Sequence, residues 1–335
     1  MRDQFDREIN YMRISITQNC NLKCMYCVSG ETSEHKRDVL SAEDIILVCT
    51  QAVKLGITNF KITGGEPLLR PDAAEIIKGI KQIPGVDSVT LTTNGVLLKD
   101  RLSELAAAGL DAVNVSLDTL KPDRYQKITG GNCFRKVIKS IRESSQLLAT
   151  KLNVVLLRGI NEDEYLDFVS FGKEHQVDVR FIELMPIGEG RKECGVSNDS
   201  ILEKLSQAYP EIRKAEKKND TVKLSKTEPR NGPAIYYEIP DFQFKIGFIS
   251  AIDHKFCKDC NRIRLTATGG LKGCLCYEKQ ENLYEILKND EIGRKEKEET
   301  VYQVLQTVIY EKPKMHHFEA EKFITEHNNM REIGG

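Results

Sequence analysis

The stretch MRISITQNCNLKCMYC, residues 12–27, joins a short apolar segment to a loop with three cysteines. Residues 12–17 are mostly apolar or β-branched, which is typical of a strand. Similar segments recur along the chain, and residues with helical apolar spacing lie between them. These segments are 59–63, 88–93, 112–118, 151–157 and 179–185. Strands that alternate with crossover helices build a parallel sheet, so the first two thirds of the chain predict an α/β fold.

The β-α units predict where functional groups gather. Six units fit a partial (β/α)6 barrel of the TIM type, and a doubly wound open sheet with another strand order is the alternative. In either arrangement polar motifs at the carboxyl ends of the strands meet at one edge of the sheet. These motifs are TQNC at 17–20, GGEP at 64–67 and TNG at 93–95. Near-continuous apolar strands suggest that both sheet faces are covered.

One helix between the strands carries signals at both ends. Ser41 with Asp44 predicts a capping box for a helix over about 42–55, and Gly56 stands at its expected C-terminal cap.

The β-α rhythm ends after Pro186. Residues 214–233 are polar and rich in turn formers, and helical patterns return at about 281–289 and 295–311. We therefore predict a barrel domain over 1–210 and a C-terminal domain over 211–335, each with its own cysteine set.

Composition limits the location and the partners. The formal net charge is -1, so no global basic field would recruit nucleic acid or a membrane surface. Without a long apolar run or a secretory leader, the chain is expected in the cytoplasm. Ten cysteines in that reducing compartment are better explained by metal ligation than by disulfides.

Six of these cysteines form two sets of three. Cys20, Cys24 and Cys27 share one loop, and a cubane iron–sulfur cluster held by three cysteines keeps one iron open for another ligand. A structural zinc ion normally takes four ligands. The second set has C-x2-C-x13-C spacing and also fits a zinc site, with Cys276 or His254 as the fourth ligand. This set comprises Cys257, Cys260 and Cys274.

The motif CxxxCxxC followed by GGEP resembles the radical S-adenosylmethionine (SAM) superfamily. The string FCKDCNRIRLTATGGLKGCL at 256–275 closely resembles the signature of the GTP 3',8-cyclase family of molybdenum cofactor biosynthesis. The same resemblance extends to RGIN at 158–161, LMPIG at 184–188, KPKMHHFE at 312–319 and the terminal IGG.

The resemblance implies two [4Fe–4S] clusters, one on each cysteine set. The first would bind SAM and cleave it reductively to a 5'-deoxyadenosyl radical, and the open iron of the second would contact guanine. The radical would remove the 3' hydrogen of GTP, and C3' would attack C8 to give (8S)-3',8-cyclo-7,8-dihydroguanosine 5'-triphosphate. An electron donor such as flavodoxin or ferredoxin is implied, with cyclic pyranopterin monophosphate synthase as the next enzyme of the pathway. The expected state is a monomer or homodimer.

The resemblance also assigns individual residues. GTP contacts are expected from Arg13, Lys61, Thr92, Lys151, Arg262, Ile263 and Arg264, and SAM contacts from Tyr26, Gly65, Ser116 and Met185. Arg13 and the terminal Gly334 and Gly335 are expected to assist catalysis. A triphosphate needs several cationic donors, and extended NRIR would point both arginines one way and the Ile263 side chain the other.

Two other functions remain open from the residues. One is a peptide-modifying radical SAM enzyme with auxiliary clusters, and the other is a non-catalytic iron–sulfur or zinc sensor. The remaining cysteines are expected to be structural or incidental, and Cys49 should be buried on the apolar face of a helix. They are Cys49, Cys133, Cys194 and Cys276.

Overall fold

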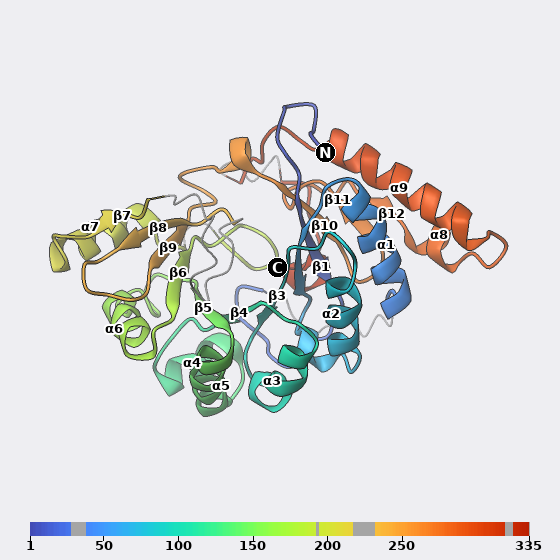
Figure 1. The fold of residues 1–335 in the computed structure, drawn as a ribbon. Helices are drawn as coiled ribbons and strands as arrows, with labels where there is room; N and C mark the ends of the chain where they lie inside the picture. The colour runs from blue at the N-terminus through green and yellow to red at the C-terminus, as the bar shows by residue number, and fades with distance from the viewer. Residues whose placement is uncertain (28–37, 192–193, 217–231, 319–323, 335) are drawn as a thin grey trace.

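The computed structural model describes residues 1–27, 38–191, 194–216, 232–318 and 324–334. The chain forms a strongly curved sheet, and helices form an arc around its outer side (Figure 1). Within the described ranges, no helix is both long and apolar enough to cross a lipid bilayer.

The six predicted strands form the centre of this sheet. They pair in parallel and in chain order, β1-β2-β3-β4-β5-β6. Their bounds are β1 Tyr11–Ser15, β2 Asn59–Thr63, β3 Ser88–Thr93, β4 Ala112–Ser116, β5 Ala149–Val154 and β6 Asp178–Ile182. A doubly wound sheet would reverse its strand order part-way, so that alternative is wrong and the partial barrel is confirmed.

Crossover helices follow these strands, as the β-α rhythm predicts. The helices are α1 Ala42–Lys54, α2 Ala73–Lys81, α3 Leu98–Ala107, α4 Pro122–Thr129, α5 Phe134–Leu147 and α6 Tyr165–His175. The capping box of α1 is confirmed, because Ser41 Oγ accepts from the Asp44 amide at 3.2 Å and the Asp44 carboxylate accepts from the Ser41 amide at 2.9 Å. Leu55 is the C-terminal cap, and Gly56 follows it with a φ of +88°.

Segments after residue 210 complete the sheet at both edges. β10 (Arg262–Leu265) pairs in parallel with β1, and β9 (Ile246–Ile249) pairs in parallel with β6. Antiparallel strands continue the sheet beyond them: β11 Gly270–Lys272, β12 Glu281–Asn282, β8 Ile235–Glu238 and β7 Arg213–Lys214. The sequence did not indicate these pairings, since strand neighbours so distant in the chain leave no local pattern. The division at residue 210 stays a prediction.

The remaining helices belong to the second half of the chain. They are α7 Asn198–Ala208, α8 Tyr284–Lys288, α9 Arg294–Tyr310 and α10 Met330–Ile333. The pattern at 281–289 contains the two-residue strand β12 before α8, while the pattern at 295–311 corresponds closely to α9. Most of the predicted polar connector, residues 217–231, lies outside the described residues.

The strands alternate between a polar inner face and an apolar outer face. On β2, Phe60 and Ile62 belong to the hydrophobic core, whereas Asn59, Lys61 and Thr63 line the interior cavity. All five residues are nonetheless buried. Period-two alternation therefore carries polar groups into the barrel while apolar groups pack beneath the helices.

Candidate active site

One continuous cavity occupies the barrel interior and reaches the carboxyl ends of its strands. Both cysteine sets line it, although they come from opposite ends of the chain. The lining cysteines are Cys20, Cys24, Cys27, Cys257, Cys260 and Cys274. All ten cysteines lie in the described residues, and none of them forms a disulfide.

The loop of the first cysteine set packs against the GGEP motif. The Gly65 amide donates to Thr17 O at 2.7 Å, and the Glu66 amide donates to Asn19 O at 2.7 Å. A Cβ at Gly65 would lie 2.6 Å from the carbonyl oxygen of Gln18, so a larger residue could not approach the loop this closely.

Glu66 fixes the relative positions of two strand-end motifs. Its buried carboxylate accepts from Thr93 Oγ1 at 2.7 Å and from the Asn94 amide at 2.7 Å. Burial raises the pKa of Glu66 to about 7, although these donors favour its ionised form. The Asn94 side-chain amide in turn lies 4.0 Å from Cys20 Sγ.

The first cysteine set has the donor chemistry that an iron–sulfur cluster requires. Burial is the main cause that raises the pKa of all three thiols, and neighbouring negative groups add to it. The pKa of Cys27 rises to about 11. These thiols are mostly protonated near neutral pH, and coordination to a metal would favour their thiolate form. Three sulfur donors from one loop fit a cubane whose remaining iron is open to another ligand.

Interactions from distant segments hold the second cysteine set in place. Cys257 begins the short 3-10 helix η3 (Cys257–Asp259), and its carbonyl accepts from Arg7 Nη1 at 2.9 Å. Lys312 Nζ donates to Gly273 O at 2.5 Å, next to Cys274. Burial opposes the ionisation of Cys260, but the charges of Arg262 and Lys312 outweigh it and lower its pKa to about 6. This electropositive all-sulfur set also fits an iron–sulfur cluster.

The two residues considered as a fourth zinc ligand lie apart from this cavity. Cys276 is fully buried in a small apolar cluster with Ile187, Leu275 and Phe318 and is not among the residues that line the cavity. His254 is exposed and lies 2.8 Å from Asp199. Cys274, and not Cys276, is thus the third cysteine of the set that faces the cavity.

Cationic side chains line the cavity at the predicted positions. In the strand register Arg13 lies between Lys61 on β2 and Arg264 on β10. Lys151 and Arg262 line the same space. Burial is the main cause that lowers the pKa of Arg13 to about 10, and the charges of neighbouring arginines add to it. This crowding of like charges fits a polyanionic ligand.

Unpartnered polar atoms support the same interpretation. Thr92 Oγ1 is buried without a hydrogen-bond partner in the described structure, as is Nε of Arg180 on β6. Buried polar atoms are nearly always paired, so a ligand is their expected partner. Arg180 was missed at the sequence level, although it occupies an inward position of a predicted strand.

The predicted SAM contacts gather around the first loop. Tyr26, Gly65, Ser116 and Met185 all line the cavity. Ser116 lies beside Asn153 in the register of β4 and β5, and Asn153 Oδ1 is buried without a partner in the described residues. Asn153 was also missed, but its position two residues after Lys151 places it on the same strand face.

The C-terminal segment reaches the cationic region. Gly334 has a φ of +76°, and its carbonyl accepts from Arg264 Nη1 at 2.6 Å. Gly335 lies outside the described residues. The Ile263 side chain is fully buried in the hydrophobic core, so only its backbone is available to a ligand. Arg331 also lines the cavity, although the sequence analysis did not single it out. Burial raises the pKa of Cys20 and Cys27, and the charge of Arg331 opposes part of that rise.

Two family models together match nearly the whole chain. Residues 14–172 match the radical SAM superfamily, and residues 177–318 match the family described as Molybdenum Cofactor Synthesis C. The GTP 3',8-cyclase of Clostridium perfringens strain 13 is 41% identical over 338 residues, and the alignment covers both chains completely. This chain belongs to the GTP 3',8-cyclase family. The GTP 3',8-cyclase of Alkaliphilus oremlandii is 39% identical over 343 residues, again with complete coverage of both chains.

A comparison with solved structures supports the fold separately from the sequence relatives. Streptococcus suis SuiB bound to S-adenosylmethionine superposes with a TM-score of 0.60 at 14% identity. The superposition covers 84% of this chain and 64% of the SuiB chain. At this identity the likeness concerns the fold alone, and the family match of residues 14–172 is what identifies the barrel as the radical SAM type.

Membership of the GTP 3',8-cyclase family confirms the resemblance that the sequence motifs indicated. The protein is a radical SAM enzyme, a class that uses S-adenosylmethionine and iron–sulfur clusters. The two cysteine sets fit iron–sulfur clusters. Because the chain belongs to a family of enzymes, a non-catalytic sensor is no longer favoured. The roles of individual residues in this GTP 3',8-cyclase stay predictions.

Proposed function

We propose that this protein converts GTP to (8S)-3',8-cyclo-7,8-dihydroguanosine 5'-triphosphate at the first step of molybdenum cofactor biosynthesis. One observation carries the proposal: both cysteine sets and the cationic strand residues line the same cavity. A cyclisation between ribose and base requires the radical source and the nucleotide to meet in one enclosed space.

The two parts of the chain would divide the work. Residues 1–210 would hold the first [4Fe–4S] cluster through Cys20, Cys24 and Cys27, together with SAM. Residues 211–335 would hold the second cluster through Cys257, Cys260 and Cys274, together with Arg262 and Arg264. When bound, the first cluster would supply the electron that cleaves SAM to methionine and a 5'-deoxyadenosyl radical, which would take the 3' hydrogen of the ribose and leave as 5'-deoxyadenosine. After C3' joins C8, the external donor would supply a second electron, and a proton would complete the dihydroguanine ring.

Residues near the first loop would bind and orient SAM. Gly65 lets the ligand approach the backbone closely, for the same steric reason that it packs against Gln18. Tyr26 offers an aromatic ring beside the cysteines, and Ser116 offers a hydroxyl at the end of β4. Met185 supplies an adaptable apolar wall.

The cationic set would hold the triphosphate of GTP. Arg13, Arg262 and Arg264 offer guanidinium donors that match phosphate oxygens in pairs, and Lys61 and Lys151 add point charges. Thr92 Oγ1 would bind the nucleotide with its free hydrogen-bonding capacity, and Ile263 would contact it through its backbone. The second cluster would hold the base, so that C3' and C8 lie within reach of each other.

Two features would act near the reacting atoms. Arg13 extends from β1 into the cavity that the first cysteine loop also lines, so it would contact the nucleotide and assist the radical step. Gly334 and Gly335 would assist the reaction beside the cationic residues, because Arg264 donates to the Gly334 carbonyl.

The proposed surroundings follow from the reaction. An electron donor such as flavodoxin or ferredoxin would reduce the first cluster, and cyclic pyranopterin monophosphate synthase would consume the product. The protein would work in the cytoplasm as a monomer or homodimer, without nucleic acid or membrane as a partner.

Anaerobic reconstitution of the full chain tests the proposal. Two cubane clusters contain about eight irons per chain. Addition of reductant, SAM and GTP should give 5'-deoxyadenosine and the cyclised isomer of GTP, both measured by mass spectrometry. Deoxyadenosine formation that does not depend on GTP would favour a peptide-modifying enzyme, and a protein with both clusters that gives neither product would refute the cyclase.

Variants separate the two halves of the site. Cys24→Ala should abolish SAM cleavage, whereas Arg262→Ala and Arg264→Ala, measured at saturating GTP, should retain cleavage and lose cyclisation. Cys194→Ala is the matched control, because Cys194 is an exposed thiol that does not line the cavity. Equal loss of cleavage in the cysteine and arginine variants would show that the arginines only support the fold.

A further inference from the structure

Asp118 connects the first cysteine loop to the carboxyl ends of β4 and β5. Tyr26 Oη donates to Asp118 Oδ2 at 2.6 Å, and the Val155 amide donates to Asp118 Oδ1 at 2.8 Å. Both carboxylate oxygens are thus used, one by the loop and one by the chain after β5. The side chain is buried, so water does not compete for these bonds.

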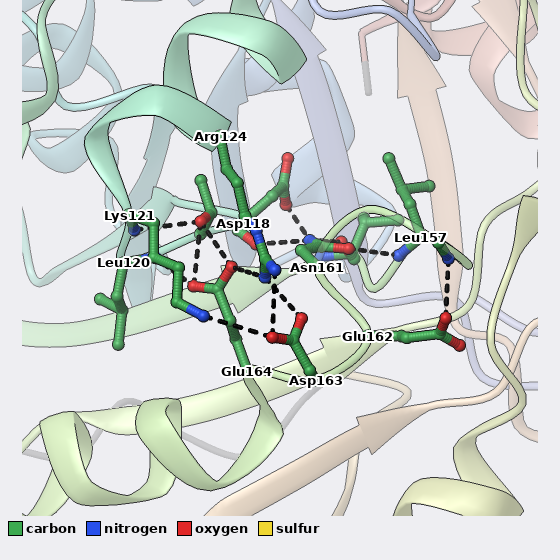
Figure 2. Close-up of polar contacts among 12 residues, drawn as sticks. Asp118, Leu120, Lys121, Arg124, Leu157, Asn161, Glu162, Asp163 and Glu164 are labelled. Carbon is green, nitrogen blue, oxygen red and sulfur yellow. Dashed lines mark hydrogen bonds and ion pairs between the residues drawn. The ribbon is translucent and has the colours of Figure 1, made fainter.

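Asn161, from the RGIN motif, binds the backbone of Asp118 and of the segment after β5 (Figure 2). Its side-chain amide donates to the carbonyls of Asp118 and, at 2.9 Å, of Val155. Its Oδ1 accepts from the Leu157 amide at 2.6 Å. Asn161 has no exposed surface, and its bonds join the segment after β4 to the segment after β5.

Glu164 extends the network to helix α4, as Figure 2 shows. Its fully buried carboxylate accepts from the Leu120 amide and from Arg124 Nη1, each at 2.7 Å. Arg124 lies in the first turn of α4, so this bond fixes the start of the helix.

The end of α4 in turn carries the cysteine loop. The Lys23 amide donates to Thr129 O at 2.8 Å, and the Met25 amide donates to Ile128 O at 2.9 Å. The loop is therefore held in two ways, through its backbone by α4 and through the Tyr26 side chain by Asp118.

We propose that Asp118 is a positioning residue that fixes the Tyr26 ring for SAM binding, with Asn161 and Glu164 holding Asp118 and α4 in place. The inference rests on the proposed function, in which Tyr26 contacts SAM. A ring already fixed in its bound orientation loses less freedom when the ligand arrives, so SAM binds more tightly. Apart from Lys151 at the start of β5, the proposed GTP contacts lie on β1, β2, β3 and β10, so GTP affinity should depend little on this network.

Binding of SAM to the reconstituted full chain, without reductant and without GTP, tests the inference. Tyr26→Phe removes the hydroxyl and keeps the ring, and Asp118→Ala removes its acceptor. Each should weaken SAM binding about tenfold, the effect of one lost hydrogen bond of roughly 1.4 kcal/mol. Because both changes break the same link, the double variant should bind no more weakly than Asp118→Ala. Asp118→Asn keeps an acceptor for Val155 and a polar partner for Tyr26, so it should restore affinity to within about threefold.

Iron content, thermal unfolding and GTP affinity complete the test. All three should stay near their wild-type values in Tyr26→Phe. Asp163→Asn is the matched control, because Asp163 is an exposed residue of the same loop that pairs with Lys121 and Arg124. Its SAM affinity should equal that of the wild type.

Two outcomes would overturn the inference. The first is a double variant whose loss of SAM affinity equals the product of the losses in Tyr26→Phe and Asp118→Ala. The second is an Asp118→Ala protein that retains its iron and binds SAM as tightly as the wild type. If Asp118→Ala does not hold iron, Tyr26→Phe decides, and wild-type SAM affinity in that variant overturns the inference. Failure of the proposed function would look different, because the wild-type protein with intact clusters would then still bind SAM but would form no cyclised GTP.

Discussion

Arg13 shows at the scale of one residue how ligand binding and stability oppose each other. It lies opposite Arg264 in the strand register, and burial lowers its pKa to about 10. Arg13 is half-buried, and a partly desolvated cation among other cations destabilises the folded protein until an anion joins them.

Replacement of this arginine should therefore have opposite effects on stability and binding. Without GTP, Arg13→Met should raise the free energy of unfolding by about 1 kcal/mol, because it removes a desolvated charge from a like-charged group. GTP affinity should fall about 100-fold, as expected for the loss of a charge-assisted bond pair. Denaturant unfolding and nucleotide binding measure the two effects, and a less stable variant in the absence of GTP would contradict the argument.

Arg7 has a structural role for the second cysteine set. It pairs with Asp3 and donates to Cys257 O at 2.9 Å and to Pro313 O at 2.7 Å. Arg7→Met should remove these bonds and leave the Asp3 carboxylate buried without its partner, a change that costs about 3–5 kcal/mol.

The expected consequence of that change is selective loss of the second cluster. Iron should fall from about eight to about four per chain, and SAM cleavage should persist when it is measured at saturating GTP. Arg2→Met is the control, because Arg2 forms an exposed ion pair with Asp6 and should keep its full iron content. Loss of all iron in Arg7→Met would show that Arg7 supports the whole fold and not one cluster.

At the scale of elements, the C-terminal helix α10 brings the tail to the active cavity. Gly334 ends this helix in the left-handed region, and a Cβ there would lie 2.8 Å from Ser15 Cβ on β1. Gly334→Ala therefore combines backbone strain with a steric clash, and the strain alone costs about 1–2 kcal/mol.

This substitution should displace the tail from Arg264. We expect cyclisation to fall at least tenfold while reductive cleavage of SAM continues, as product and 5'-deoxyadenosine yields would show. Gly293→Ala serves as control, since a Cβ at Gly293 meets no atom within 4 Å. Wild-type cyclisation by Gly334→Ala would show that the tail has no part in the reaction.

Secondary structure was predictable wherever the determining signal is local. The capping box of α1 depends on neighbours within a few residues and is visible in the sequence. The prediction of near-continuous apolar strands was wrong for β2, because Asn59, Lys61 and Thr63 face the cavity and only Phe60 and Ile62 join the hydrophobic core. The last residues of several predicted strands were assigned too generously: residues 155–157 and 183–185 have strand-like composition but lie beyond β5 and β6. Backbone pairing ends before the apolar pattern does, because these residues turn into the loops that carry the site.

At the scale of the whole molecule, one sheet unites both halves of the chain. β10 covers the edge of β1, and β9 covers the edge of β6. A fragment of residues 1–210 should therefore expose two long strand edges and associate through them.

Size-exclusion chromatography and thermal unfolding of that fragment check this expectation. It should elute as aggregates and show no cooperative transition, whereas the full chain stays discrete and unfolds cooperatively. A discrete fragment with a sharp transition would mean that the barrel half folds without its C-terminal strands.

The sequence by itself determined the β-α rhythm, the two cysteine sets and the motifs that place the chain in its family. Spacing within a segment reports its local conformation and the face on which each residue lies. Only the tertiary structure decided that Arg264 lies beside Arg13, that Arg7 bonds to Cys257, and that Asp118 holds Tyr26. Arg7 and Cys257 are 250 residues apart, and such contacts depend on which strands become neighbours when the whole sheet assembles. No local pattern encodes that choice, because it minimises the free energy of all strands and helices together.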